Sequence, residues 1–200
     1  MLDNEGHLRD LLEHVADLSG VALLPAAIEH LRSLDATELP EMAASPRLGP
    51  CVGGVGKIIG VGLYYKDHAA ESGMAIPQEP ALFLKPTSAT IGPNDDVEIP
   101  LGSEKQTGRS SSASSSEILA SILRIEQALD HVADYCIVND VSERAYQLER
   151  GGQWDKGKGC DTFAQMGPWL VTPDEVGDPQ ELDLWLEVDG QRLQRGNTRT

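Results

Sequence analysis

Basic residues are scarce in this 200-residue chain, which has 16 Lys and Arg against 32 Asp and Glu and a formal charge of −16. Nucleic-acid binding needs a basic face, and binding to an anionic membrane surface needs basic clusters, so the charge argues against both kinds of partner. A local group of cations can still bind an anionic substrate. The simplest role of the acidity is solubility.

Cysteine is also scarce, with Cys51, Cys136 and Cys160 as the three residues and no C-x-x-C motif. An odd number without paired spacings predicts a reducing compartment and no disulfide framework, and it disfavours a finger-type zinc site. No apolar run is long enough to span a membrane, and the acidic start MLDNEGHLRD lacks the hydrophobic segment of a signal peptide. We therefore expect a cytoplasmic protein.

The first quarter of the chain predicts a small helical appendage. Leucines and valine at helical spacing predict a helix over residues 7–18, and Pro25 is placed to begin a second helix over 25–34. Residues 35–54 are rich in proline and glycine and predict an ordered linker. We expect an N-terminal helical appendage over residues 1–54, joined to the main domain over 55–200.

The rest of the chain predicts mainly strands, so the expected fold class is a β-rich α+β domain. The glycine-rich GGVGKIIGVG does not fit a phosphate-binding loop, because Lys57 is followed by Ile58. Asp189-Gly190 is a hairpin turn signal. An amphipathic pattern predicts one helix over residues 118–135. Residues rich in β-branched and aromatic side chains predict strands at 57–65, 81–86, 97–100, 169–172 and 184–188.

The stretch over residues 137–167 carries the densest chemistry. An apolar run, residues 135–138, ends in Asn139-Asp140, which predicts a buried strand that delivers a carboxylate at its end. Charged residues and glycines then alternate beside Trp154 and Phe163. Glycines allow a close approach to a ligand, so we favour a binding or catalytic site here over a polar surface loop.

His68 and Glu71 are a second candidate site. Three residues apart, they face the same way on a helical turn. A carboxylate that holds one imidazole nitrogen fixes the tautomer and raises the basicity of the other nitrogen. A surface ion pair on a short helix is the alternative, and the spacing alone favours it.

Four segments together resemble the fumarylacetoacetate hydrolase family: GVGLYYKDHAAESG, ALFLKPTSATIGPNDDVEIP, YCIVNDVSERAYQLERGGQWDKGKGCDTF and GPWLVTPDEVGDPQELDLWLEVDG. They look most like the bacterial branch of ureidoglycolate lyases and 2,4-diketo-3-deoxy-sugar-acid hydrolases. The resemblance implies a mixed β-roll with flanking helices, a homodimer, and Mg²⁺ or Mn²⁺ as cofactor. It implies cleavage of a C–C or related bond in a small 2-keto or 1,3-diketo acid.

The resemblance also implies roles for individual residues. His68 with Glu71 matches a dyad that activates water, and Asp140 matches a strand-end metal ligand. Gln147 matches a substrate-contacting glutamine, and Lys158 matches a lysine that holds the enolate or carboxylate. The chemistry is consistent, because a divalent cation chelated by a 2-keto acid stabilises enolate charge and a lysine adds a positive charge.

The resemblance breaks over residues 106–127. The family places two metal-binding glutamates, one residue apart, in a motif close to DWEVELGIVIG, where this chain reads QTGRSSSASSSE. One interpretation is a flexible Ser-rich linker. The other is a local frameshift, because suitable codons for Gln106–Glu117, read from the third base of codon 106, encode DWEVELGIVIG. The helix expected over 118–135 would then be partly an artefact.

Family members also continue beyond Thr200, so we expect a C-terminally truncated chain. One carboxylate ligand without the paired glutamates should bind Mg²⁺ poorly, so we expect little or no activity from the chain as written. One alternative is a catalytically dead remnant that keeps the surface of the roll as a binding domain. Another is a purely structural dimerisation module, in which neither His68 nor Lys158 has a chemical role.

Overall fold

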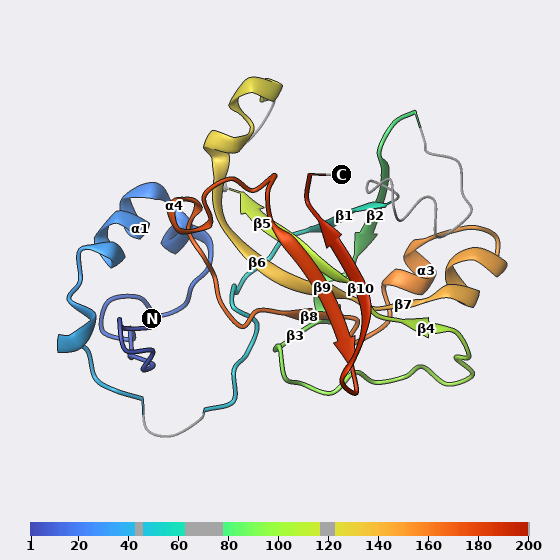
Figure 1. Cartoon of the computed structure of the whole chain (residues 1–200), viewed down its shortest axis with the longest axis horizontal. Helices are drawn as coiled ribbons and strands as arrows, with labels where there is room; N and C mark the ends of the chain where they lie inside the picture. Colours follow the sequence, from blue (N-terminus) through green and yellow to red (C-terminus); the bar gives the residue numbers. More distant parts are fainter. Residues whose placement is uncertain (43–45, 63–77, 117–122, 200) are drawn as a thin grey trace.

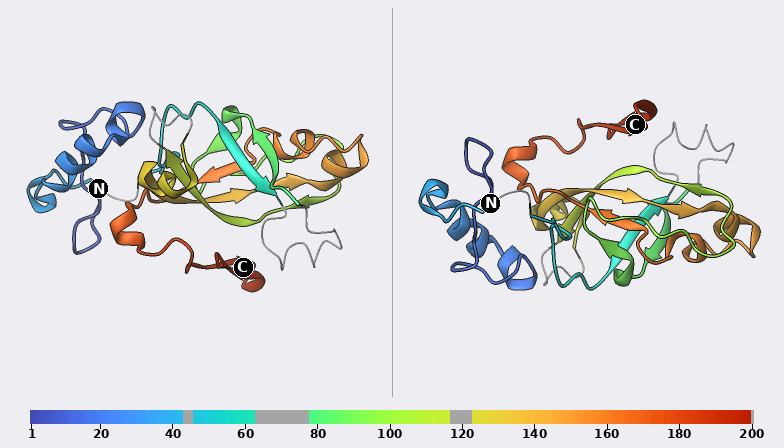
Figure 2. Two further views of the ribbon diagram at one scale, coloured as in Figure 1. Left: turned by 90° about the horizontal axis from the view of Figure 1, so that it is seen from above. Right: turned by 90° about the horizontal axis from the view of Figure 1, so that it is seen from below.

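The computed structural model describes residues 1–42, 46–62, 78–116 and 123–199. The N-terminal segment packs at one end of a β-rich body (Figure 1). Seen from the edge, the hairpin of β1 (Ile58–Gly62) and β2 (Ala81–Lys85) lies on one side of the central sheet. The hairpin of β9 (Asp183–Val188) and β10 (Gln191–Asn197) lies on the other side (Figure 2). The central sheet is therefore the middle layer of the body.

The central sheet has four strands in the order β3-β8-β6-β5. Antiparallel pairs join β5 to β6 and β6 to β8, whereas β3 and β8 are parallel, so the sheet is mixed. Burial alternates along β6, as expected for a strand with one face against the core. The bounds are β3 Thr90–Ile91, β5 Ser110–Ser116, β6 Val132–Asp140 and β8 Ala164–Met166.

The strands predicted at 57–65, 81–86 and 184–188 and the hairpin turn predicted at Asp189-Gly190 agree with the structure over the described residues. β1 (Ile58–Gly62) pairs with β2 (Ala81–Lys85), and β9 (Asp183–Val188) pairs with β10 (Gln191–Asn197). The turn of the second hairpin has positive φ at both Asp189 and Gly190, as a two-residue turn between twisted strands requires.

The hairpin of β1 and β2 has two different faces. On its inner face Phe83 is buried over Gly60, where an added Cβ would lie 2.1 Å from the ring, so this position needs glycine. On its outer face four apolar side chains are exposed in two cross-strand pairs, Ile59 with Leu84 and Val61 with Leu82.

Short elements complete the body. β4 (Gln106–Thr107) pairs with β7 (Ser142–Glu143), and a π-helical turn, η6 (Ala145–Glu149), follows directly. The other short elements are η3 Thr87–Ala89, α3 Asp155–Lys158 and α4 Pro173–Val176. Within the described ranges, none of the helices has both the length and the apolar content to cross a bilayer.

The N-terminal segment contains η1 (Gly20–Leu23), α1 (Pro25–Arg32) and η2 (Ala36–Glu38). The helix predicted over 25–34 is confirmed by α1, which begins at Pro25 because proline suits the first helical turn. The segment is not separate from the sheet, since Leu23 shares a buried core with side chains of the segment before β1 and of β6 and β8. That core consists of Leu23, Val52, Cys136, Val138 and Met166.

The helix predicted over residues 7–18 is wrong. This stretch forms turns and isolated bridges, and Leu12 is 68% exposed. The carboxylate of Asp3 accepts hydrogen bonds from the N–H groups of Glu5 and His7, which competes with helical pairing. The N–H of Asp10 donates to the carbonyl of Pro40, so contacts distant in sequence override the apolar spacing.

The helix predicted over 118–135 is wrong for its described part. Residues 123–131 contain only the short turns η4 (Ile125–Gln127) and η5 (Leu129–His131), and β6 starts at Val132. Ile125 is 90% exposed, so the apolar pattern here has no core to face.

Two predicted strands are also wrong. Residues 97–100 are irregular, and over residues 169–172 only Val171 forms a bridge, to Tyr135. The first stretch ends at Pro100 and the second follows Pro168, and a proline cannot donate to a ladder of hydrogen bonds.

Candidate active site

Asp140 lies at the end of β6 between two buried lysines. Lys85 Nζ is 3.0 Å from Oδ1, and Lys158 Nζ contacts Oδ2. The side chains of Lys85 and Lys158 are 3% and 5% exposed, and that of Asp140 is 15% exposed. The strand-end carboxylate predicted from the sequence is therefore in place, and the structure brings Asp140 and Lys158 together.

Lys85 is a site residue that the sequence reasoning missed. Its ammonium group donates to the carbonyls of Val141 (3.0 Å), Lys158 (2.6 Å) and Phe163 (2.8 Å). Burial lowers the pKa of Lys85, and the adjacent Asp140 opposes that change. The available signal was a lysine at the end of an apolar strand, because a lysine is almost never fully buried unless it is paired.

Lys158 ends the short helix α3. Burial lowers its pKa to about 8, while the contact with Asp140 opposes the shift. Its Nζ also lies 4.5 Å from the centroid of the Phe83 ring, a distance typical of a cation–π contact. The helix packs closely because residue 157 is glycine: an added Cβ would lie 2.3 Å from the carbonyl oxygen of Glu143.

Gln147 lies in the π-helical turn η6 and is 2% exposed. Its Oε1 accepts a hydrogen bond of 2.7 Å from Nη1 of Arg144, whose Nε donates to Thr107 Oγ1 at 2.8 Å. Burial and Arg109 lower the pKa of Arg144, whereas Asp140 raises it. Arg144 is thus an electrostatic neighbour of Asp140, and it is a second residue that the sequence reasoning missed.

Glu143 is fully buried beside this cluster but is already satisfied. It accepts hydrogen bonds from the hydroxyl of Ser103 and from the N–H groups of Lys105 (3.1 Å) and Ala145 (2.9 Å). Burial raises the pKa of Glu143, but these hydrogen bonds outweigh it and lower the pKa overall. Glu143 therefore fixes the loop before β4 against β7.

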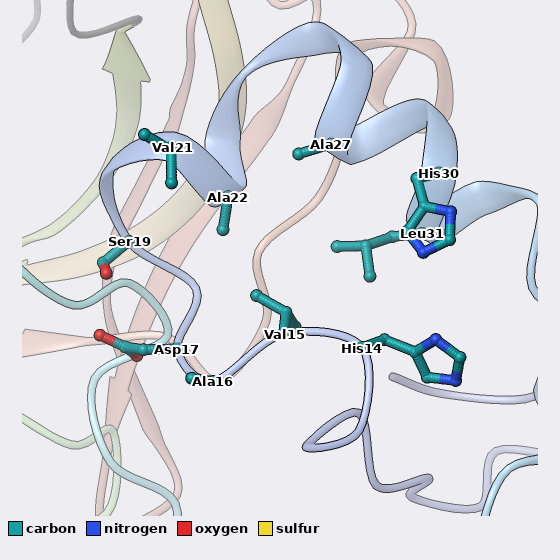
Figure 3. A pocket seen from close by; sticks show the side chains of 10 residues that line it. All are labelled: His14, Val15, Ala16, Asp17, Ser19, Val21, Ala22, Ala27, His30 and Leu31. Atoms are coloured by element: carbon teal, nitrogen blue, oxygen red, sulfur yellow. The ribbon is translucent and has the colours of Figure 1, made fainter.

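His68 and Glu71 lie outside the described residues, so their pairing as a water-activating dyad stays a prediction. A cavity of about 460 Å³ lies away from Asp140, in the N-terminal segment. His14 and His30 stand at one end of it with ring centroids 6.0 Å apart, and Asp17 and Ser19 at the other (Figure 3). Its remaining lining residues are Val15, Ala16, Val21, Ala22, Ala27 and Leu31.

The cluster around Asp140 does not fit a divalent metal ion. Mg²⁺ and Mn²⁺ need several oxygen ligands, usually carboxylates and waters. Here each carboxylate oxygen of Asp140 faces an ammonium group, and the described ranges hold no group of three or more His, Cys, Asp or Glu that could hold a metal. Oδ1 has no hydrogen-bond partner within those ranges, so its contact with Lys85 is an ion pair without hydrogen-bond geometry.

The Ser-rich stretch runs beside Asp140 as strand β5, so the prediction of a flexible linker is wrong for residues 110–116. Ser111 is paired with Val138, and the carbonyl of Arg109 accepts a hydrogen bond of 2.8 Å from the N–H of Asp140. Directly opposite residues of an antiparallel pair share a face, and side chains alternate along each strand. Positions 109 and 111 therefore lie on the same face of the sheet as Asp140.

The comparisons with known proteins agree on one family. Residues 57–200 match the family model described as fumarylacetoacetate (FAA) hydrolase C-terminal. A Burkholderia ambifaria relative, named only as a hydrolase, is 56% identical over all 200 residues, which cover 71% of its length.

Solved structures give the same result. The fumarylacetoacetate hydrolase of Exiguobacterium antarcticum superposes with a TM-score of 0.81 at 30% identity, over 98% of this chain and 70% of that one. A 5-carboxymethyl-2-hydroxymuconate delta-isomerase of Mycobacterium smegmatis gives 0.67 at 37% identity, over 76% of this chain and 59% of that one. The predicted β-rich α+β roll is confirmed, and the chain belongs to the fumarylacetoacetate hydrolase family.

Proposed function

We propose that this chain carries the keto-acid-binding cluster of a hydrolase or lyase that cleaves a C–C or related bond in a small 2-keto or 1,3-diketo acid. One observation carries the proposal. Lys158 contacts the carboxylate of Asp140, and Arg144, which is electrostatically coupled to Asp140, donates a hydrogen bond to the buried Gln147.

The local charge favours an anionic ligand although the chain is acidic overall. Lys85, Lys158 and Arg144 carry positive charges, while Asp140 and the neighbouring Glu143 carry negative ones, which leaves the cluster net positive within a chain of −16. A guanidinium group matches a carboxylate with two parallel hydrogen bonds, whereas an ammonium group acts as a point charge on an oxygen. In this proposal Arg144 binds the substrate carboxylate and Lys158 stabilises the keto or enolate oxygen.

The family resemblance implies Mg²⁺ or Mn²⁺, but the described residues of this chain do not fit that ion. We therefore propose that the chain as written binds a keto acid and turns it over poorly. In this proposal, positions 109 and 111 are where the paired glutamates of the family motif would lie. The two glutamates of the shifted reading frame fall at these positions, which share a face with Asp140.

The finer assignments are proposals as well. The solved neighbour named as a 5-carboxymethyl-2-hydroxymuconate delta-isomerase supports a small carboxylated substrate. Within that range we propose the branch of ureidoglycolate lyases and 2,4-diketo-3-deoxy-sugar-acid hydrolases. We also propose a cytoplasmic homodimer, with His68 and Glu71 activating water.

Calorimetric titration with oxalate in metal-free buffer tests the binding proposal. We expect saturable binding that weakens about ten-fold or more in Lys158→Met, because a charge-assisted hydrogen bond is lost. Lys156→Met is the matched control: it lies on the same helix, but its ammonium group donates to the carbonyl of Arg150. Absence of binding, or equal weakening in both variants, would refute the proposal and favour a dimerisation module.

Turnover of oxaloacetate or an acylpyruvate tests the second part. We expect the chain as written to show little or no activity with added Mg²⁺. Robust Mg²⁺-dependent turnover by the purified chain would show that the missing carboxylates are supplied elsewhere.

A further inference from the structure

Two thiols meet where the N-terminal segment packs on the central sheet. Cys136, in the middle of β6, is 8% exposed and belongs to the buried core cluster. Cys51, in the segment before β1, is half-buried and packs against the same cluster, with its thiol close enough to Cys136 to affect its pKa.

The position of Gly167 gives an independent check on this contact. The N–H of Gly167 donates to the carbonyl of Ile137, the residue after Cys136, at 3.0 Å. A Cβ built on Gly167 would lie 3.6 Å from the Cβ of Cys51. Cys51 therefore lies against β6 at the level of Cys136.

We propose that Cys51 and Cys136 are an oxidation site, at which peroxide or a low-molecular-weight disulfide forms an intramolecular disulfide between the N-terminal segment and β6. Neither the family resemblance nor the keto-acid proposal uses these thiols. The contact between the side chains, the partial exposure of Cys51 and the burial of Cys136 carry the proposal.

The environment assigns different roles to the two sulfurs. The neighbouring thiol of Cys136 lowers the pKa of Cys51, while the thiol of Cys51 and burial raise the pKa of Cys136. Cys51 is then the thiolate that attacks, since thiolate character and access control cysteine reactivity.

The reaction with peroxide balances in two steps. The Cys51 sulfur attacks one oxygen of hydrogen peroxide, the O–O bond breaks, and a sulfenic acid and hydroxide form. The Cys136 sulfur then attacks the sulfenic sulfur, and the S–O bond breaks as water leaves. Two thiols and one peroxide give one disulfide and two waters, with the sulfurs oxidised and the peroxide reduced.

Cys160 provides a control within the same chain. Its Sγ lies 3.7 Å from the carbonyl oxygen of Lys156, and burial raises the pKa of its thiol. Its environment therefore favours the unreactive thiol form, and Cys160→Ser should leave the reaction of the other pair unchanged.

Thiol counting and peptide mapping of the full chain test the proposal. Treatment with hydrogen peroxide or glutathione disulfide should reduce the number of free thiols, counted in the denatured chain, from three to one, and a proteolytic map should show a peptide linking Cys51 to Cys136. The oxidised chain should unfold at a higher temperature, and reduction should reverse the shift, because the bond closes a long loop.

A substitution of Cys51 tests whether this thiol forms the cross-link. Cys51→Ser, at the half-buried position, should abolish the cross-link without opening a cavity in the core, so the result does not depend on a Cys136 variant that folds. Three free thiols after oxidation, a link to Cys160, or a cross-link between two chains in place of the intramolecular one would overturn the proposal.

Discussion

Lys85→Met should destabilise the fold more than any change of a surface lysine. The substitution keeps most of the apolar volume but removes a buried ammonium group that donates to three carbonyls and pairs with Asp140. Removing one partner of a buried charged group costs about 3–5 kcal/mol, because the groups left behind are desolvated and unpaired.

The size of this loss is measurable against the stability of a typical domain, which is about 5–15 kcal/mol. Lys158 remains beside Asp140, so the carboxylate keeps one cation and the cost comes mainly from the carbonyls of Val141, Lys158 and Phe163. We therefore expect a decrease of about 3–5 kcal/mol in the free energy of unfolding.

Urea denaturation followed by circular dichroism measures this change, with the midpoint and the slope fitted separately. Lys156→Met is the control, since that ammonium group is exposed and donates to a single carbonyl. A decrease below about 1 kcal/mol in the free energy of unfolding of Lys85→Met lies within the range of ordinary surface substitutions. It would refute the conclusion that the buried hydrogen bonds of Lys85 to three segments stabilise the fold.

Three further changes test other parts of the structure. Arg109→Glu with Ser111→Glu should create saturable Mn²⁺ binding in calorimetry, because both carboxylates join Asp140 on one face; Arg109→Gln with Ser111→Gln should not. The folded pKa of Lys158, about 8, lies below its unfolded value, so the unfolded chain binds more protons between about pH 8 and 10.5, and stability should rise with pH there. The contribution of Lys158, up to about 3 kcal/mol, should appear as the difference between denaturation series of the unchanged chain and of Lys158→Met across that window. Gly157→Ala should cost about 1–3 kcal/mol, because its Cβ meets the Glu143 carbonyl, whereas Gly56→Ala, with open space, should cost little.

Each of these predictions has a contrary result. Equal Mn²⁺ affinity in the double Glu variant and the double Gln variant would show that carboxylates at positions 109 and 111 do not form a metal site with Asp140. The same dependence of stability on pH in the unchanged chain and in Lys158→Met would contradict the depressed pKa of Lys158. Equal melting temperatures for Gly157→Ala and Gly56→Ala would show that the helix α3 can move away from β7 at no cost.

The features that the sequence predicted correctly depend on local chemistry. The strand β2, the helix α1 and the Asp189-Gly190 turn follow from side-chain periodicity, a proline at a helix start and residues that tolerate positive φ. The end of β6 was also readable, because an apolar run stops at a polar pair. Asp140 and Lys158 are therefore found together, although their chemical roles stay predictions.

The features that the sequence missed depend on partners distant along the chain. Lys85 is satisfied by carbonyls up to 78 residues away, which no local pattern encodes. The apolar spacing of residues 7–18 suits a helix, but Asp10 is paired with the carbonyl of Pro40 instead. The serines of β5 have little intrinsic signal for a strand, and pairing with β6 decides their conformation.

The outer face of the β1–β2 hairpin has a consequence for handling the protein. Ile59, Val61, Leu82 and Leu84 form an exposed apolar strip, while the whole chain carries a charge of −16. Mutual repulsion between chains keeps such strips apart at neutral pH and low ionic strength. Acid protonates the carboxylates and salt screens them, so either condition should bring molecules together through this strip. Buffer composition therefore controls the colloidal state of this chain, and binding titrations belong at neutral pH and low salt.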